Sequence, residues 1–81
     1  MEGTNLKEIL SYIVENLVEF PEQIVITEVE TAETYTLQLR VAESDMGKVI
    51  GRQGRIAKEI RAIVKGAGSK SPKKIMVDIL D

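Results

Sequence analysis

The spacing of apolar residues switches between the helical and the strand period along this chain, and the order of the switches restricts the fold. Over residues 4–19 apolar side chains recur three and four positions apart, as in a helix with one face on a core. They are Leu6, Ile9, Leu10, Ile13, Val14, Leu17 and Val18. Thr4 or Asn5 is placed to cap the first turn. Phe20-Pro21 predicts the end of the helix, because a residue before proline avoids helical geometry.

Strand patterns follow this helix and return at the end of the chain. β-branched residues are frequent over 23–30, and apolar and polar side chains alternate strictly over 34–41. The short segment 31–33 between them predicts a hairpin with one face on the core. A last strand is predicted over 75–80. Three of its apolar side chains point the same way: Ile75, Val77 and Ile79.

Two helices are predicted between the second and the last strand. Ser44 can cap a short helix over 45–50, although Gly47 weakens it. A longer helix over 55–65 is followed by a loop over 66–72 that contains a capping glycine and a proline. The longer helix has an apolar face, made by Ile56, Ala57, Ile60, Ile63 and Val64. Its basic face is made by Arg55, Lys58, Arg61 and Lys65.

The order helix, strand, strand, helix, helix, strand indicates an α+β fold of two layers, with the helices on one face of a three-stranded sheet. We expect residues 1–81 to form one domain, because the chain is too short for two. It has no cysteine and no histidine, so burial of apolar side chains must stabilise it without disulfides.

The same composition restricts the possible functions. General acid–base catalysis usually recruits histidine and thiol chemistry needs cysteine, so we do not expect an enzyme, a metal site or a cofactor. No apolar run approaches the roughly 18 residues of a membrane span, and the chain does not start like a signal peptide. These observations predict a soluble, cytoplasmic protein.

Charge is distributed very unevenly along the chain. The net charge is −2, but residues 1–45 contain 10 acidic and 2 basic residues, a net charge of −8. Residues 46–74 contain 9 basic residues and a single acidic one, Glu59, a net charge of +8. This asymmetry predicts one basic face on an otherwise acidic body, which is typical of nucleic-acid binding. A basic helix exposed to solvent with no partner gives the same pattern.

The most informative motif is Val-Ile-Gly-Arg-Gln-Gly-Arg-Ile, residues 49–56. Gly51 and Gly54 stand between the two predicted helices, where they allow a sharp turn and let a bulky ligand approach the backbone. The turn opens onto a helix N-terminus, whose N–H groups and dipole favour phosphate. Lys48, Arg52 and Arg55 add positive charge. These features predict a clamp for a sugar–phosphate backbone, beside apolar residues that can hold unstacked bases.

Val-Ile-Gly-x-x-Gly-x-x-Ile resembles the signature of the KH domain, a module that binds single-stranded RNA. The added helix and strand before the strand–helix–helix–strand core resemble the type II arrangement, and in particular the small stand-alone bacterial KH proteins of the KhpA type. This resemblance implies a type II KH fold with a mixed sheet, whose second and third strands are parallel.

The resemblance also implies roles for individual residues. The RNA backbone clamp would be formed by Gly51, Arg52, Gln53 and Gly54. Lys48, Arg55 and Lys58 would contact phosphates, and Ile50 and Ile56 would support or line the base groove, although both could simply pack in the core. Lys70, Lys73 and Lys74 lie in or just after the loop that varies most among type II domains and could extend the RNA path. No aromatic residue lies in the motif, so we expect modest affinity and slight sequence preference.

KH proteins of this type act as homodimers or with a second, larger KH-containing RNA-binding protein. The resemblance therefore implies such a partner, and a role as an RNA chaperone or post-transcriptional regulator linked to cell-wall growth and cell length. Two alternatives remain open from the residues. One is a KH-fold module that binds protein, and the other is a binder of single-stranded DNA, which the same groove accepts.

Overall fold

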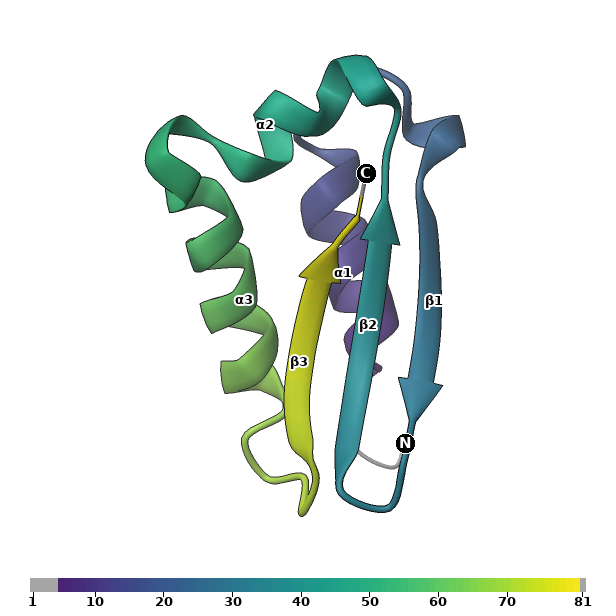
Figure 1. The fold of residues 1–81 in the computed structure, drawn as a ribbon, viewed down its shortest axis with the longest axis vertical. Coiled ribbons are helices and arrows are strands. Elements are labelled where there is room, and N and C mark those ends of the chain that lie inside the picture. The colour runs from purple at the N-terminus through teal and green to yellow at the C-terminus, as the bar shows by residue number, and fades with distance from the viewer. Residues whose placement is uncertain (1–4, 81) are drawn as a thin grey trace.

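The computed structural model describes residues 5–80, which form a three-stranded sheet with helices packed on one face (Figure 1). The helices and strands, in chain order, are α1 (Leu6–Glu15), β1 (Val25–Glu30), β2 (Thr34–Arg40), α2 (Met46–Ile50), α3 (Arg55–Ala67) and β3 (Lys74–Ile79). Short 3-10 turns precede β1, α2 and α3, at Pro21–Gln23, Glu43–Asp45 and Arg52–Gly54. The predicted α-β-β-α-α-β order and the α+β class are confirmed.

The sheet is mixed, as the resemblance implied. β2 lies in the centre, antiparallel to β1 and parallel to β3. Leu37 of β2 lies opposite Glu28 on one neighbour and Val77 on the other. The turn between β1 and β2 is held by Thr31, whose hydroxyl accepts a hydrogen bond from the N–H of Thr34 at 2.9 Å. The parallel β2–β3 pair requires a long crossover, and α2 and α3 supply it.

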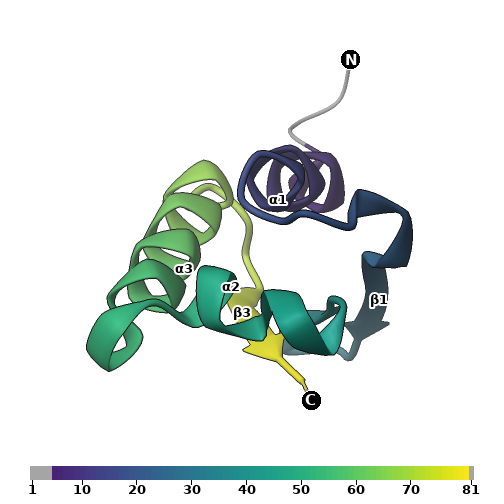
Figure 2. The same ribbon diagram turned by 90° about the horizontal axis from the view of Figure 1, so that it is seen from above.

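One apolar core joins the two layers. Helices α1 and α3 lie on the same side of the sheet, as the view from above shows (Figure 2). The buried core side chains are Leu6, Leu10, Val14, Leu37, Leu39, Val49, Ile60, Val64, Ile75 and Val77. They come from three helices and two strands, so the position of α2 and α3 is fixed by packing rather than by the helices' own stability.

The predicted end of the first helix is wrong. α1 ends at Glu15, four residues before the predicted boundary, and Asn16 caps it. The Asn16 side chain donates to the Tyr12 carbonyl at 2.7 Å. The N–H of Leu17 then bonds three residues back, to Val14, which tightens the turn. Asparagine is common at such a position because its amide competes for backbone groups.

The predicted start of this helix is partly confirmed. The Asn5 side chain accepts a hydrogen bond from the N–H of Glu8 at 3.2 Å, so Asn5 is the N-cap. The alternative cap, Thr4, lies outside the described residues.

Two details of the later helices also differ from the prediction. Ser44 does not cap α2, because it lies inside the 3-10 turn and the residue at the cap position is Asp45. Ile63, predicted on the core face of α3, is 51% exposed. The core of α3 is made by Ala57, Ile60 and Val64, and Ile63 lies at the edge of that stripe.

Candidate nucleic-acid interface

The loop between α2 and α3 has an unusual backbone. Gly51 has φ 75° and ψ 177°, Gln53 has φ 58° and ψ 27°, and Gly54 has φ 75° and ψ 13°. Three residues of four therefore have positive φ, a region that glycine enters freely and other residues seldom. Gln53 is the only non-glycine residue with positive φ among residues 5–80. The loop turns the chain sharply from α2 into α3 (Figure 1).

The two glycines are required for different reasons. A Cβ atom on Gly51 would lie 2.6 Å from Cγ1 of Ile56, well inside van der Waals contact. A Cβ atom on Gly54 would meet nothing within 4 Å, so only its positive φ favours glycine there. Gly51 thus lets Ile56 pack against the loop backbone, while Gly54 leaves the other side of the loop open.

The loop presents its middle residues to solvent. Arg52, Gln53 and Arg55 are exposed, while both glycines are half-buried. The N–H of Gly54 bonds to the Gly51 carbonyl at 3.2 Å, so the loop is closed by its own backbone. Behind it begins α3, a helix of 13 residues whose N-terminus carries partial positive charge toward the loop.

The two isoleucines beside the loop differ in burial. Ile50 is 37% exposed at the end of α2. Ile56 is half-buried and packs against the core, with its side chain against Gly51. The base-groove role therefore suits Ile50, whereas Ile56 has the supporting position.

The cations of residues 46–74 fall into two groups. Three of them contact other groups of the protein: Lys48, Arg61 and Lys73. The side chains of the other six have neither an acidic partner nor a hydrogen bond among residues 5–80: Arg52, Arg55, Lys58, Lys65, Lys70 and Lys74. Three of the six lie in the loop or in the first turns of α3, namely Arg52, Arg55 and Lys58, and the other three lie toward the far end of α3 and beyond it.

Lys48, predicted as a phosphate contact, lies against acidic residues instead. Its Nζ is 3.3 Å from Oδ1 of Asp45 and 3.7 Å from Oε1 of Glu19. A phosphate would have to compete with these carboxylates. Arg52 and Arg55, in contrast, have no acidic partner among residues 5–80.

Asp45 is a buried carboxylate that sequence reasoning missed. It is fully buried, and its two oxygens accept hydrogen bonds from the N–H groups of Glu19 and Phe20, each at 3.0 Å. Burial alone would raise the pKa of Asp45, but these two N–H groups and Lys48 outweigh it and hold the pKa below its usual value. Asp45 thus ties the segment after α1 to the start of α2. In the sequence, Asp45 is simply an acidic residue at the start of a predicted helix, and no local pattern distinguishes a buried aspartate there from an exposed one.

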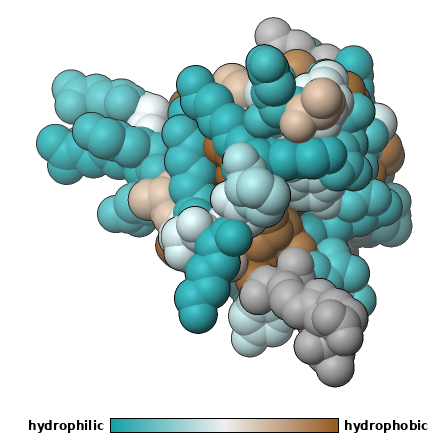
Figure 3. Space-filling model, turned by 90° about the horizontal axis from the view of Figure 1, so that it is seen from below, coloured by the Kyte–Doolittle hydropathy of each residue, from teal (hydrophilic) through white to brown (hydrophobic). Residues whose placement is uncertain are grey.

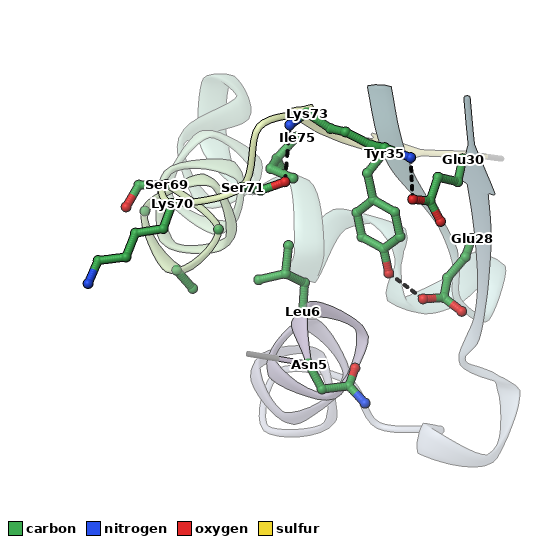
Figure 4. Close-up of a pocket in the computed structure, with 13 residues that line it drawn as sticks. Asn5, Leu6, Glu28, Glu30, Tyr35, Ser69, Lys70, Ser71, Lys73 and Ile75 are labelled. Carbon is green, nitrogen blue, oxygen red and sulfur yellow. Dashed lines mark hydrogen bonds and ion pairs between the residues drawn. The ribbon is translucent and has the colours of Figure 1, made fainter. Parts of the chain in front are cut away.

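A pocket of about 880 Å³ lies at the opposite end of the molecule from the loop. Figure 3 looks onto this end, where apolar side chains show between hydrophilic ones. The pocket is lined by the start of α1, by β1 and β2, and by the segment from α3 to β3 (Figure 4). Its two carboxylates are paired: the Tyr35 hydroxyl donates to Glu28, and Lys73 forms an ion pair with Glu30. Burial and these carboxylates raise the pKa of Tyr35.

The pocket separates the three loop lysines of the prediction. Lys70 and Lys73 both line the pocket, but only Lys73 has a side-chain partner, Glu30. Lys70 and Lys74 are exposed, and their side chains have no partner among residues 5–80. Glu28 and Glu30 lie beside these lysines, so positive and negative charges are mixed at this end of the molecule.

A family model described as KhpA/KhpB, KH domain, matches residues 7–79, which include α2, α3 and the glycine loop between them. The chain belongs to the KhpA/KhpB family of KH domains. Together with the strand order and the mixed sheet, this membership establishes a KH fold.

Individual members of the KhpA/KhpB family are similar over nearly the whole chain. The RNA-binding protein KhpA of Listeria monocytogenes serovar 1/2a is 49% identical over 76 residues, covering 94% of this chain and 100% of the relative. The RNA-binding protein KhpA of Clostridium perfringens is 48% identical over 75 residues, covering 93% and 100%. The RNA-binding protein KhpA of Chlamydia trachomatis is 40% identical over 76 residues, covering 94% and 97%.

Residues 5–80 contain neither a cluster of metal ligands nor a candidate membrane span. Within that range, no three histidine, cysteine, aspartate or glutamate side chains come together as metal ligands would. No helix in the same range has the length and apolar character needed to cross a membrane.

Proposed function

We propose that this protein binds single-stranded RNA through the loop Gly51–Gly54. One observation carries the proposal: exposed Arg52 and Gln53 stand on a backbone with three positive φ values, directly before α3, in a chain that belongs to the KhpA/KhpB family. The relatives compared above are named RNA-binding proteins.

The unpaired cations supply the phosphate contacts in this proposal. Arg52 and Arg55 meet the backbone at the loop, and Lys58 follows one turn along α3. Ile50 offers an exposed apolar surface beside them for a base. A KH groove holds about four nucleotides, and neutralising three or four phosphates gives a slope of roughly −2 to −3 in log affinity against log salt.

Loop charge favours nucleic acid over a protein-binding role. Arg52 and Arg55 are exposed and meet no acidic side chain among the described residues, so a polyanion would gain their full charge. Single-stranded DNA differs from RNA only by the 2′-OH and is the second candidate ligand.

The wider role follows from the family resemblance. We propose a cytoplasmic RNA chaperone or post-transcriptional regulator without enzymatic activity, which forms a homodimer or pairs with a larger KH-containing RNA-binding protein. A single groove without aromatic stacking gives modest affinity, and pairing raises it by bringing two grooves to one RNA.

The test is a polarisation titration of short single-stranded RNA against the wild type and the double variant Arg52→Asp/Gln53→Asp. The variant lowers the net charge at the loop by three units and keeps both glycines. We expect affinity to fall at least thirtyfold, on the order of 2 kcal/mol, because two carboxylates then face the phosphates. Circular dichroism checks that both proteins fold.

A matched control separates loop contact from total charge. Lys7→Asp/Gln23→Asp changes the net charge by the same three units at exposed positions outside α2, the loop and α3. We expect this control to bind RNA nearly as the wild type does. Equal loss in both variants would reduce the role of the loop to bulk charge. Undiminished binding by the loop variant would contradict the proposal.

A further inference from the structure

Arg61 is held in an unusual position on α3. Its Nε donates a hydrogen bond to the Val77 carbonyl of β3 at 3.1 Å, and its side chain is half-buried. The N–H of Leu80 bonds to the Leu39 carbonyl of β2, and successive residues of a strand bond to opposite sides, so the Val77 carbonyl points away from β2 at the free edge of β3. The guanidinium is therefore pinned at the edge of the sheet that faces α3.

The other donors of Arg61 stay free. A guanidinium has five N–H donors in a rigid planar fork, and the bond to Val77 uses one of them. Arg61 makes no second hydrogen bond or ion pair among residues 5–80. No buried side-chain nitrogen or oxygen in that range is without a partner, so Nη1 and Nη2 reach solvent. A pinned fork with open ends is preorganised for a ligand with two acceptors.

The surroundings of Arg61 suit a nucleic acid strand. Lys58 and Lys65 lie three positions before and four positions after it on α3, both exposed and without partners. Arg55, at the loop, lies six residues away, which is about 9 Å along the helix. A strand bound at the loop therefore passes Arg61 within the length of a KH groove.

We infer that Arg61 selects bases with two adjacent hydrogen-bond acceptors, which are guanine and cytosine. The inference rests on the proposed RNA binding and adds sequence preference to it. Guanine offers O6 and N7 to an arginine fork, and an unpaired cytosine offers O2 and N3. Adenine places its N6 amino group beside both N1 and N7, and uracil places its N3–H between O2 and O4, so the all-donor fork of Arg61 meets a donor on these edges.

This preference goes beyond what the residue pattern predicts. Periodicity assigns Arg61 only to the basic face of the helix, and the absence of aromatic residues predicts slight preference. The contact with Val77, 16 residues further along the chain, distinguishes Arg61 from Lys58 and Lys65 on the same face.

The test measures binding of four short RNAs: an oligouridine, and the same strand with its two central residues replaced by guanosine, cytidine or adenosine. The proteins are the wild type, Arg61→Lys and Arg55→Lys. Both variants replace a fork by a point charge, but only Arg61 is pinned to the sheet.

The expected pattern is specific to Arg61. The wild type binds the guanosine strand, the cytidine strand or both about tenfold more tightly than the other two. Arg61→Lys loses this preference while its affinity for oligouridine stays within about twofold, and Arg55→Lys keeps the preference. If Arg61→Lys does not fold by circular dichroism, Arg61→Gln replaces it, since its amide keeps one donor for the Val77 carbonyl.

Several results would overturn the inference. They are a wild type without preference, a preference for adenosine or uridine, a preference that survives in Arg61→Lys, and one that is also lost in Arg55→Lys. If the wild type binds all four strands equally and Arg52→Asp/Gln53→Asp binds none, base selection fails and RNA binding by the loop stands. If the wild type binds none of the strands, both proposals fail together.

Discussion

The glycine loop and the pocket at the other end of the molecule are both polar and accessible, but their charges are arranged in opposite ways. In the pocket each carboxylate has a partner: Glu28 accepts a hydrogen bond from Tyr35, and Glu30 forms an ion pair with Lys73. At the loop, Arg52 and Arg55 have none among the described residues. A charged ligand gains more from groups that the protein has left unpaired, because it need not displace an internal partner.

The comparison also places the proposed RNA site on a part of the surface without a hollow. The pocket has a volume of about 880 Å³, yet both of its carboxylates already have partners. The loop is a protruding turn whose value lies in backbone shape and open charge. Single-stranded RNA, with exposed phosphates and bases, fits a protruding site of this kind.

The largest effect is expected from replacing a glycine at each end. Gly51→Ala places Cβ 2.6 Å from Ile56 at φ 75°, whereas Gly68→Ala places it 2.8 Å from the end of the flexible Leu6 side chain at φ −98°. We expect Gly51→Ala to lower the free energy of unfolding by about 3 kcal/mol, from strain and overpacking together. We expect Gly68→Ala to lower the free energy of unfolding by only about 1 kcal/mol, because the end of the Leu6 side chain can move. Urea denaturation measures both, and equal costs would show that backbone strain does not distinguish the loop.

The next effect concerns the buried Asp45 near the loop end. Asp45→Asn places an amide N–H₂ where an oxygen accepts from Glu19 or Phe20, leaving donors facing each other. We expect the melting temperature to fall on the order of 10 °C at neutral pH. Thermal denaturation followed by circular dichroism measures this. An unchanged melting temperature would mean that Asp45 does not hold α2 in place.

The pH dependence of the same variant supplies a second check. The folded pKa of Asp45 is lowered, so its contribution to stability is complete above the ordinary carboxyl pKa. That contribution is lost as the pH falls through the lowered pKa. The difference in melting temperature between wild type and Asp45→Asn should therefore shrink in acid. A difference that stays constant would assign the effect to packing instead.

A direct comparison of paired and unpaired cations follows. Arg55→Gln should weaken RNA binding five- to tenfold, about 1 kcal/mol, and make the salt slope less negative by about 0.7. Lys73→Gln should leave RNA affinity within about twofold, because Lys73 is engaged with Glu30. Polarisation titrations at two salt concentrations measure both variants. Equal weakening would remove the distinction between the two ends.

Much of the fold follows from the sequence because its determinants are local. Period and β-branching identify the helices and the strands, and two glycines three apart identify the loop. Errors arise where distant contacts decide. Ile63 belongs to the apolar set of α3 by angle, but no neighbouring element covers it and it is 51% exposed.

The loop residues of the candidate site could be predicted from the sequence, but which of the nearby cations have partners within the protein could not. Arg52, Gln53 and both glycines follow from the motif. That Lys48 lies on Asp45, and that Arg61 bonds to Val77, depends on which segments the fold brings together. Residue type alone does not separate a cation that is engaged from one that is open.

The smallest effect is expected at the pocket, from Tyr35→Phe. Burial and the nearby Glu28 and Glu30 carboxylates raise the pKa of Tyr35, so the folded protein holds the phenol proton more tightly than the unfolded chain does. The resulting stabilisation is complete below the unfolded tyrosine pKa of about 10 and is lost as the pH rises above it.

Tyr35→Phe should therefore lower the free energy of unfolding by less than about 1 kcal/mol at neutral pH, because it removes the hydrogen bond to the exposed Glu28. It should also reduce the loss of stability in alkali, as measured by urea denaturation at pH values on both sides of 10. RNA affinity should not change, because the RNA site proposed at the loop lies at the opposite end of the molecule from the pocket. A loss of affinity in Tyr35→Phe would extend the RNA interface to this end of the molecule.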